Sequence, residues 1–278
     1  MKKIDCHLHI HTREGQDTPE QLIEKLNAAG FDGAIVIGDN PTSFKSSLDE
    51  VPIPNDKRLE NLFAVTAGHP ELYPFYWLDP NEPDVFEQID RAIERGVYGF
   101  KCIPNWFYVS DERPVEVWRY IAKTGKPVMF HSGILWDSSA SADFTRPINF
   151  EPLLFIPGFR FSMAHVSWPW CDEMIALYGK WNFLRSVNGG KVADLYVDLT
   201  PGTPPSYREE VFRKLFGTGY RLDHIMFGTD NRIFDYNVKS AKGWIDTDNA
   251  IYEKLGLSQQ VIDDVYGGAF LRFIGEER

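Results

Sequence analysis

The sequence predicts an α/β fold, specifically a (β/α)8 TIM barrel. Short apolar runs, typical of buried parallel strands, alternate with amphipathic stretches that begin and end at helix-capping residues. This strand-then-helix unit occurs eight times in 278 residues, which is the usual length of such a barrel. An open, doubly wound sheet is the alternative, but no Gly-x-Gly-x-x-Gly follows the first apolar run. We expect one domain over residues 1–278, because no linker or low-complexity segment interrupts the pattern.

The first units show the pattern most clearly. Lys3–His9 is the first expected strand. Thr18 and Pro19 suit the N-cap and first position of a helix, which Gly30 ends. Ala34–Ile37 and Leu62–Ala67 are the second and third expected strands, and the third ends near His69.

The remaining units follow in the same order. The later expected strands are Tyr98–Cys102, Pro127–His131, Arg160–His165, Ala193–Leu199 and His224–Gly228. The later expected helices are Pro83–Glu94, Pro114–Lys123, Phe150–Phe155, Pro169–Tyr178, Tyr207–Phe216, Val238–Leu255 and Ser258–Tyr266. The polar stretches Asn40–Asp56 and Leu135–Asn149 are long enough to be lids over a site.

Composition excludes several classes of partner. A net charge of −11 argues against nucleic acid, because a phosphate-backbone binder needs a concentrated basic surface. There is no signal-peptide pattern, and no apolar run approaches the roughly 18 residues of a membrane span. The three cysteines are far apart and suggest no disulfide framework, which favours a reducing, cytoplasmic location. We expect a small-molecule substrate, and a homo-oligomer is compatible with this composition.

Two histidines at the end of the first strand indicate a metal site. His7 and His9 are spaced i, i+2, so they lie on the same face of a strand. Two imidazoles on one face can hold a divalent ion, although the motif alone also fits a solvated surface strand.

Further polar residues fall at the ends of later expected strands. They are His69, Lys101, His131, His165 and Asp230, and together with His7 and His9 they place five of the seven histidines at strand ends. Because a barrel builds its active site at the carboxyl ends of its strands, we expect these side chains to share one rim.

In this order the residues resemble the amidohydrolase superfamily of metal-dependent hydrolases. The strings Asp5-Cys6-His7-Leu8-His9, Gly99-Phe100-Lys101 and Phe227-Gly228-Thr229-Asp230 are most similar to its amidohydrolase-related branch. That branch contains hydrolases and non-oxidative decarboxylases. The usual Gly-Asn-Ala pattern near its C-terminus is replaced here by Gly267-Gly268-Ala269.

The expected metal ligands are His7, His9, His131 and Asp230. Imidazole and carboxylate ligands favour zinc, with manganese or iron as alternatives, and one or two ions per chain are possible. The resemblance implies that Asp230 also accepts a proton from the attacking water. His165 either joins a second metal site or polarises a substrate carbonyl. The alternatives are purely structural roles: Asp230 would be a helix N-cap, and His131 and His165 would be core histidines.

Lys101 is the pivotal residue of the expected site. In two-metal members of the superfamily the corresponding lysine is carboxylated and bridges the ions, whereas an unmodified lysine would bind a substrate carboxylate, which we favour. Arg146 would help to hold an anionic substrate, and Trp106 and Trp168 would wall its pocket. A surface arginine and ordinary packing tryptophans are the alternatives.

These residues together predict a metal-dependent hydrolase that activates water to cleave a C–O or C–N acyl bond in an ester, lactone or amide. Asp230, His165 and Lys101 are the expected catalytic residues. One alternative is a non-oxidative decarboxylase of an aromatic or unsaturated acid, which would use almost the same ligands. The other is a non-catalytic barrel that binds a ligand.

Overall fold

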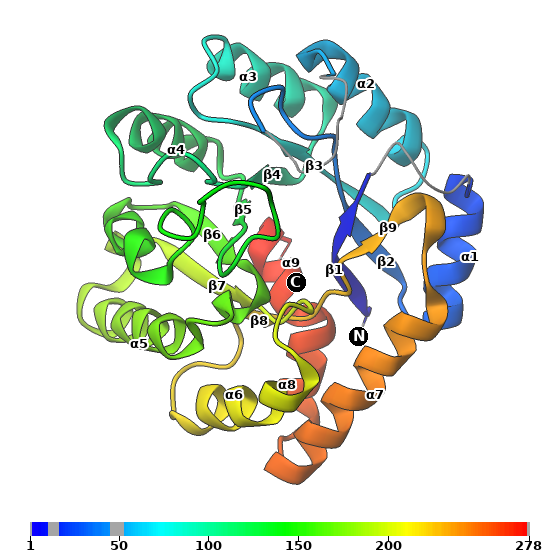
Figure 1. Cartoon of the computed structure of the whole chain (residues 1–278), viewed down its shortest axis with the longest axis vertical. Coiled ribbons are helices and arrows are strands. Elements are labelled where there is room, and N and C mark those ends of the chain that lie inside the picture. Colours follow the sequence, from blue (N-terminus) through cyan, green and yellow to red (C-terminus); the bar gives the residue numbers. More distant parts are fainter. Residues whose placement is uncertain (1, 11–16, 45–52, 277–278) are drawn as a thin grey trace.

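The computed structural model describes residues 2–10, 17–44 and 53–276, and its strands form one parallel sheet (Figure 1). The sheet order is β8-β7-β6-β5-β4-β3-β2-β1-β9, so successive strands are neighbours. The strands are β1 (Ile4–His9), β2 (Gly33–Ile37), β3 (Leu72–Trp77), β4 (Gly99–Cys102), β5 (Val128–Phe130), β6 (Arg160–Met163), β7 (Asp194–Asp198), β8 (Ile225–Met226) and β9 (Asn231–Arg232).

The last barrel strand is split in two, and its two parts close the sheet. β8 pairs with β7, and β9 pairs with β1 a few residues later. Between them, the backbone N–H of Cys6 donates to the carbonyl oxygen of Phe227 at 3.1 Å. Residues 225–232 therefore contact both neighbours, and the predicted TIM barrel is confirmed.

Helices surround this sheet (Figure 1). They are α1 (Pro19–Ala29), α2 (Asn55–Thr66), α3 (Val85–Arg95), α4 (Glu112–Thr124), α5 (Cys171–Asn188), α6 (Pro205–Gly217), α7 (Val238–Leu255), α8 (Gln259–Asp263) and α9 (Ala269–Ile274). The α1 caps are confirmed, because Thr18 forms a capping box and Gly30 ends the helix at a φ of 96°. No helix in the described part of the chain has an apolar stretch that could cross a membrane.

Two expected helices take other forms. The expected helix Phe150–Phe155 is the end of a 3-10 helix over Pro147–Phe155, with Pro152 inside it. The segment before α9, Asp264–Gly268, is a π-helix. A 3-10 helix is wound more tightly than an α-helix and a π-helix more widely. The spacing of apolar residues in the sequence does not distinguish these forms from an α-helix.

The third strand lies later in the chain than the sequence predicted. Leu62–Ala67 is mostly the last part of α2, whose residues Leu59, Leu62 and Val65 are buried at the i, i+3 spacing of a helix. β3 is instead Leu72–Trp77, which contains Pro74, a residue that disfavours a strand assignment. His69 therefore precedes β3 and lies away from the carboxyl ends of the strands, which corrects its expected place on the rim.

The core has one layer between helices and sheet and another inside the barrel. The inner layer includes Cys6, Phe75 and Met129 from the strands, and Phe270 and Phe273 from α9. Phe270 packs edge-on against Tyr73 at the start of β3, so α9 covers the amino end of the strands. The carboxyl ends are thereby left for the site.

Candidate metal centre

Three potential ligands converge where the end of β1 meets the segment between β8 and β9. The Nε2 atoms of His7 and His9 are 3.1 Å apart, and Oδ1 of Asp230 lies 3.7 and 3.5 Å from them, respectively. Ligand atoms about 2.0 Å from a tetrahedral zinc ion are separated from one another by roughly 3.3 Å. The spacing of these three atoms therefore fits a single divalent ion, and they form the cluster of metal-binding type found among the described residues.

Asp198, which the sequence analysis missed, orients His7. The His7 Nδ1–H donates to Oδ2 of Asp198 at 2.7 Å, and the backbone N–H of Thr200 donates to Oδ1 at 2.7 Å. Burial alone would raise the pKa of Asp198, but the adjacent His7 and these hydrogen bonds lower it below its usual value. Because Nδ1 carries the proton, the Nε2 lone pair of His7 faces the cluster. The position of Asp198 at the end of a predicted strand was the signal that could have found it.

A second buried carboxylate, Asp5, holds the segment that carries Asp230. Asp5 accepts from the Thr229 backbone N–H at 2.8 Å, the Thr229 hydroxyl at 2.6 Å and the Tyr236 hydroxyl at 3.1 Å. Burial raises the pKa of Asp5 to about 7 although these hydrogen bonds oppose the shift. Asp230 itself has a φ of 56°, an uncommon value for a residue with a side chain. This turn directs its carboxylate back toward β1.

His165 follows β6 in a strained turn rather than ending the strand. His165, Val166 and Ser167 all have positive φ values, of 62°, 43° and 56°. The Nδ1–H of His165 donates to the carbonyl oxygen of Pro201 at 3.2 Å, which leaves Nε2 as the unprotonated nitrogen of the neutral ring. Burial lowers the pKa of His165 and so favours that neutral form.

His131, directly after β5, lies beside His165, with ring centroids 4.9 Å apart. Its Nε2 is buried and has no hydrogen-bond partner among the described residues. Burial, and then the proximity of His165 and Lys101, lower the pKa of His131 well below its usual value. A buried ring nitrogen without a hydrogen-bond partner at this place suits a further ligand, although His131 is outside the three-residue cluster.

Lys101 projects from β4 to the same point. Its side chain is buried, and Nζ is 3.0 Å from Nε2 of His7. Burial lowers the pKa of Lys101 to about 8, against the opposing effect of Asp230 and Asp198. The amine is thus mainly cationic at pH 7 with an appreciable neutral fraction.

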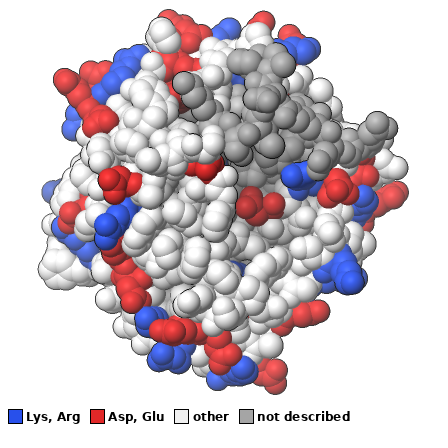
Figure 2. Space-filling view, viewed as in Figure 1, with Lys and Arg blue, Asp and Glu red and all other residues white. Residues whose placement is uncertain are grey.

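The cluster opens into a cavity of about 390 Å³. The polar side chains His7, His9, Lys101, His131, His165 and Asp230 lie on one part of its wall. The rest of the wall is formed by Phe44, Trp77, Ile103, Ile134, Leu135, Trp136, Trp168, Pro201 and Gly202. Figure 2 shows uncharged side chains over much of the centre of one face of the molecule and charged ones mainly around its edge.

The structure brings most of the sequence-predicted site residues to this cavity, but not all. Trp168 lines it, as do Trp77 and Phe44, which were not expected. Arg146 does not, because its Nε donates to the Glu173 carboxylate at 3.1 Å and its guanidinium stacks on Trp170. Trp106 is also outside the wall and is 48% exposed. Of the two expected lids, residues 45–52 lie outside the described residues, while Leu135 and Trp136 of the other line the cavity.

Comparison with known proteins agrees with this architecture. An uncharacterised TIM-barrel protein from Bordetella bronchiseptica has a TM-score of 0.73 at 16% identity, with 99% of each chain covered. A probable 2-pyrone-4,6-dicarboxylic acid hydrolase from Acinetobacter baumannii, with citric acid bound, has a TM-score of 0.62 at 13% identity, covering 99% of this chain and 100% of the other. An amidohydrolase from Burkholderia multivorans with bound HEPES has a TM-score of 0.66 at 11% identity, with 99% of each covered.

At identities of 11–16%, these solved structures show only that the fold is shared. A search of curated proteins found no match to the sequence. The family-level result is broader, because the model of the family described as amidohydrolase matches residues 4–274. That match includes every residue of the cluster and of the cavity wall. The chain therefore belongs to the amidohydrolase family.

Proposed function

We propose that this enzyme of amidohydrolase type is a metal-dependent hydrolase, which activates water to cleave a C–O or C–N acyl bond in a small anionic substrate. The observation that carries the proposal is the convergence of His7 Nε2, His9 Nε2 and Asp230 Oδ1 within hydrogen-bond to van der Waals distance in a cavity that also holds Lys101. His7, His9 and Asp230 would hold the ion, with His131 as a further ligand. Zinc fits the donor set best, and the buried, free thiols of the cysteines support a cytoplasmic location.

A divalent ion bound there would supply Lewis-acid polarisation of the water and of the scissile carbonyl. Asp230 would accept the proton of the attacking water, a role supported by its membership of both the ligand cluster and the cavity wall. Asp5 and Thr229 hold the Asp230 segment in this position.

The protonation of His165 changes the role expected for it. A neutral ring whose Nδ1–H is engaged by Pro201 has no N–H at Nε2 with which to polarise a carbonyl. Its Nε2 suits a metal ligand or a proton acceptor instead. The cationic form of Lys101 would then stabilise negative charge on the substrate, which is supported by its position on the cavity wall.

The cavity restricts the substrate class. Among the residues that the structure describes, Lys101 is the lysine on the cavity wall and Arg146 is not part of that wall, so the anionic-substrate proposal is supported here by Lys101. A small anionic substrate is also in keeping with the similar probable 2-pyrone-4,6-dicarboxylic acid hydrolase, whose structure has citric acid bound. We therefore favour lactones or amides of about cavity size that carry one carboxylate.

Metal stoichiometry and turnover test the proposal together. Protein purified without chelator or nickel would be analysed for metal by plasma mass spectrometry and assayed with a panel of esters, lactones and amides. We expect about one ion per chain with Lys101 unmodified, and about two ions with a carbamate on Lys101 in the two-metal alternative. His9→Asn should lose both metal and turnover, whereas His69→Asn, at the other end of the barrel, should keep both.

The remaining outcomes separate the alternatives. Release of carbon dioxide from aromatic acids, without incorporation of labelled oxygen from water, would replace the hydrolase by the decarboxylase. Tight metal binding without turnover of any ester, lactone, amide or acid would favour the non-catalytic barrel. Absence of bound metal in active enzyme would contradict the metal-dependent mechanism.

A further inference from the structure

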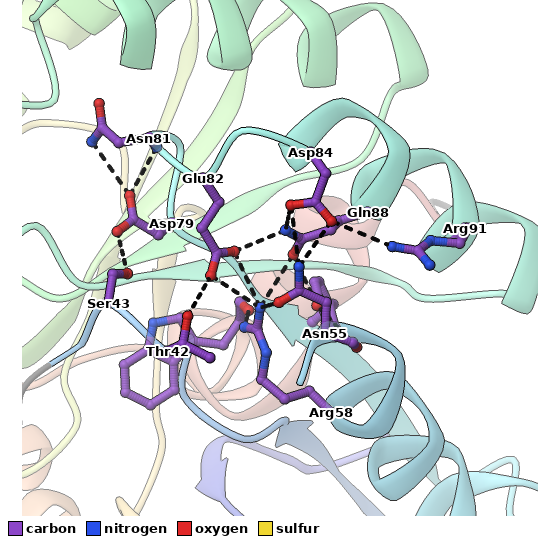
Figure 3. Close-up of polar contacts among 12 residues, drawn as sticks. Thr42, Ser43, Asn55, Arg58, Asp79, Asn81, Glu82, Asp84, Gln88 and Arg91 are labelled. Carbon is purple, nitrogen blue, oxygen red and sulfur yellow. Dashed lines mark hydrogen bonds and ion pairs between the residues drawn. The ribbon is translucent and has the colours of Figure 1, made fainter. Parts of the chain in front are cut away.

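A buried polar network lies behind the aromatic wall of the cavity (Figure 3). At its centre is Arg58 of α2, which is fully buried. Nη1 of Arg58 donates to the carbonyl oxygen of Trp77 at 2.8 Å, and Nη2 lies 3.1 Å from Oε2 of Glu82. Arg58 therefore ties α2 to the last residue of β3 and to the loop that follows it.

Two hydroxyl groups from the segment after β2 join this network. The Thr42 hydroxyl donates to Oε1 of Glu82 at 3.4 Å, and the Ser43 hydroxyl donates to the carboxylate of Asp79 (Figure 3). Asp79 also accepts from the backbone N–H of Asn81 at 2.8 Å, which fixes its orientation. The carboxylates of Asp79 and Glu82 thus join the loops after β2 and β3.

The residue after Ser43 faces the cavity. The Phe44 ring lies 5.0 Å from that of Trp77, and Trp77 lies edge-on to His9 with centroids 5.9 Å apart. Trp77 is anchored by its carbonyl to Arg58, and Phe44 by its neighbour to Asp79. The same buried network therefore holds the segments that carry both rings of this aromatic pair. Of the pair, Trp77 contacts His9 of the cluster.

We propose that Glu82, held by Arg58, and Asp79, held by the backbone N–H of Asn81, are positioning residues that place the aromatic pair Phe44–Trp77 beside His9 and so give the cavity its preference for a flat, apolar group next to the scissile bond. The positioning part stands on the contacts alone, and the substrate part rests on the proposed function. Pairs of aromatic rings in such a wall favour stacking or edge contact with a flat group.

The buried ion pair of Arg58 and Glu82 supports a positioning role for the network rather than a role in packing alone. Glu82 is the carboxylate paired with Arg58 in the described part of the chain, and both are buried. A buried ion pair is weak evidence for stability, because hydrophobic residues of similar volume stabilise a core equally well. Its directional bonds to one carbonyl and one loop hydroxyl specify geometry instead.

The test separates positioning from folding. Arg58→Ala would leave Glu82 as an unpaired buried charge and can unfold the protein, so the test variant is Thr42→Val with Ser43→Ala, which leaves the Arg58–Glu82 pair intact. The matched control is Thr247→Val with Ser186→Ala. These hydroxyls also donate to protein acceptors, the carbonyls of Gly243 and Phe183, but neither residue lines the cavity.

The first readout is fluorine NMR of metal-free protein labelled with 5-fluorotryptophan. The chain has 8 tryptophans, and the Trp77 signal is assigned with Trp77→Phe. We expect the Trp77 signal to shift or broaden in the test variant while signals remote from the cavity stay unchanged, and no change in the control. An unchanged Trp77 signal in the folded test variant would overturn the positioning role.

The second readout uses zinc-loaded protein and two hydroxamate probes that share a metal-binding group. We expect the affinity of benzohydroxamate relative to acetohydroxamate to fall by about fivefold in the test variant, with zinc affinity unchanged. A changed Trp77 signal with an unchanged affinity ratio would overturn the preference for flat groups. If wild-type protein binds no zinc, the proposed function fails, and the fluorine signal still decides the positioning.

Discussion

Single residues decide the chemistry of the cluster through the protons they carry. Asp198 and Pro201 each accept a hydrogen bond from a ring Nδ1, so that Nε2 of His7 and of His165 is left with its lone pair. The common orientation of His7 and His9 was predictable from the sequence, because it follows from the alternation of side chains along one strand. Asp198 was not singled out, because its contact with His7 joins residues 191 positions apart.

Asp198→Asn should weaken zinc binding by about 10- to 100-fold, the usual effect of losing the partner of a ligand histidine. The Thr200 N–H donates to Oδ1, so the amide oxygen of the variant would stay there and turn its NH2 toward Nδ1 of His7. That arrangement favours a proton on Nε2, where the metal should bind. Zinc affinity would be measured by competition with a chromophoric chelator.

Asp194→Asn is the matched control, since Asp194 starts the strand that Asp198 ends. It pairs with Arg185 instead of a histidine, and zinc affinity should stay at the wild-type value. Equal affinities for all three proteins would show that the orientation of His7 does not depend on Asp198.

At the scale of elements, local pattern predicted most helices and strands, and it failed where tertiary contacts compete with it. The apolar run Leu62–Ala67 was predicted as a strand, but with Leu59 it forms the buried face of a helix. Pro74 made the actual third strand, β3, difficult to predict, because proline is uncommon within strands. Gly228, between the two parts of the eighth strand, passes close to His7, where an added Cβ would lie 2.8 Å from that of the histidine. Such close approaches depend on partners that no local window contains.

Gly267→Ala should destabilise the protein, by about 1–3 kcal/mol as expected for overpacking. A Cβ at Gly267 would overlap the backbone carbonyl oxygen of Lys2, which cannot move as a side chain can. The free energy of unfolding would be measured by urea titration of metal-free protein.

Gly243→Ala provides the contrast within α7. No atom lies within 4 Å of a Cβ added there, so the gain in helix propensity of about 1 kcal/mol should appear as increased stability. If Gly267→Ala were as stable as wild type, the π-helix and the N-terminal strand would not be packed as described.

At the scale of the whole molecule, the site links protonation to stability. Both His131 and His165 have pKa values lowered by burial, so the folded protein binds fewer protons than the unfolded chain below about pH 6.5. Their contribution to stability is therefore present above that pH and is lost as the pH falls. Asp5 acts oppositely, because its raised pKa makes its contribution decline as the pH rises toward about 7.

A comparison of His131→Asn with wild type isolates the contribution of His131 to the pH dependence of stability. In the presence of chelator, we expect the variant to lose less unfolding free energy than wild type between pH 7 and pH 5, by up to about 1.4 kcal/mol per pH unit. Urea titrations at several pH values provide the measurement. His69→Asn should keep the wild-type slope, and a wild-type slope in His131→Asn would contradict the assigned pKa direction.

The sequence by itself determined the barrel, the amidohydrolase resemblance and the set of polar residues that meet at the strand ends. The barrel and the shared rim follow from periodicity, length and the rule that parallel strands end together, whereas the resemblance rests on short motifs such as His7-Leu8-His9. Only the tertiary structure decided that Arg146 and Trp106 lie away from the cavity, that Asp198 faces His7, and that Phe44 and Trp77 form one wall. The reason is physical: loop conformations and buried hydrogen bonds depend on partners distant in the sequence, and those partners are defined only once the chain is folded.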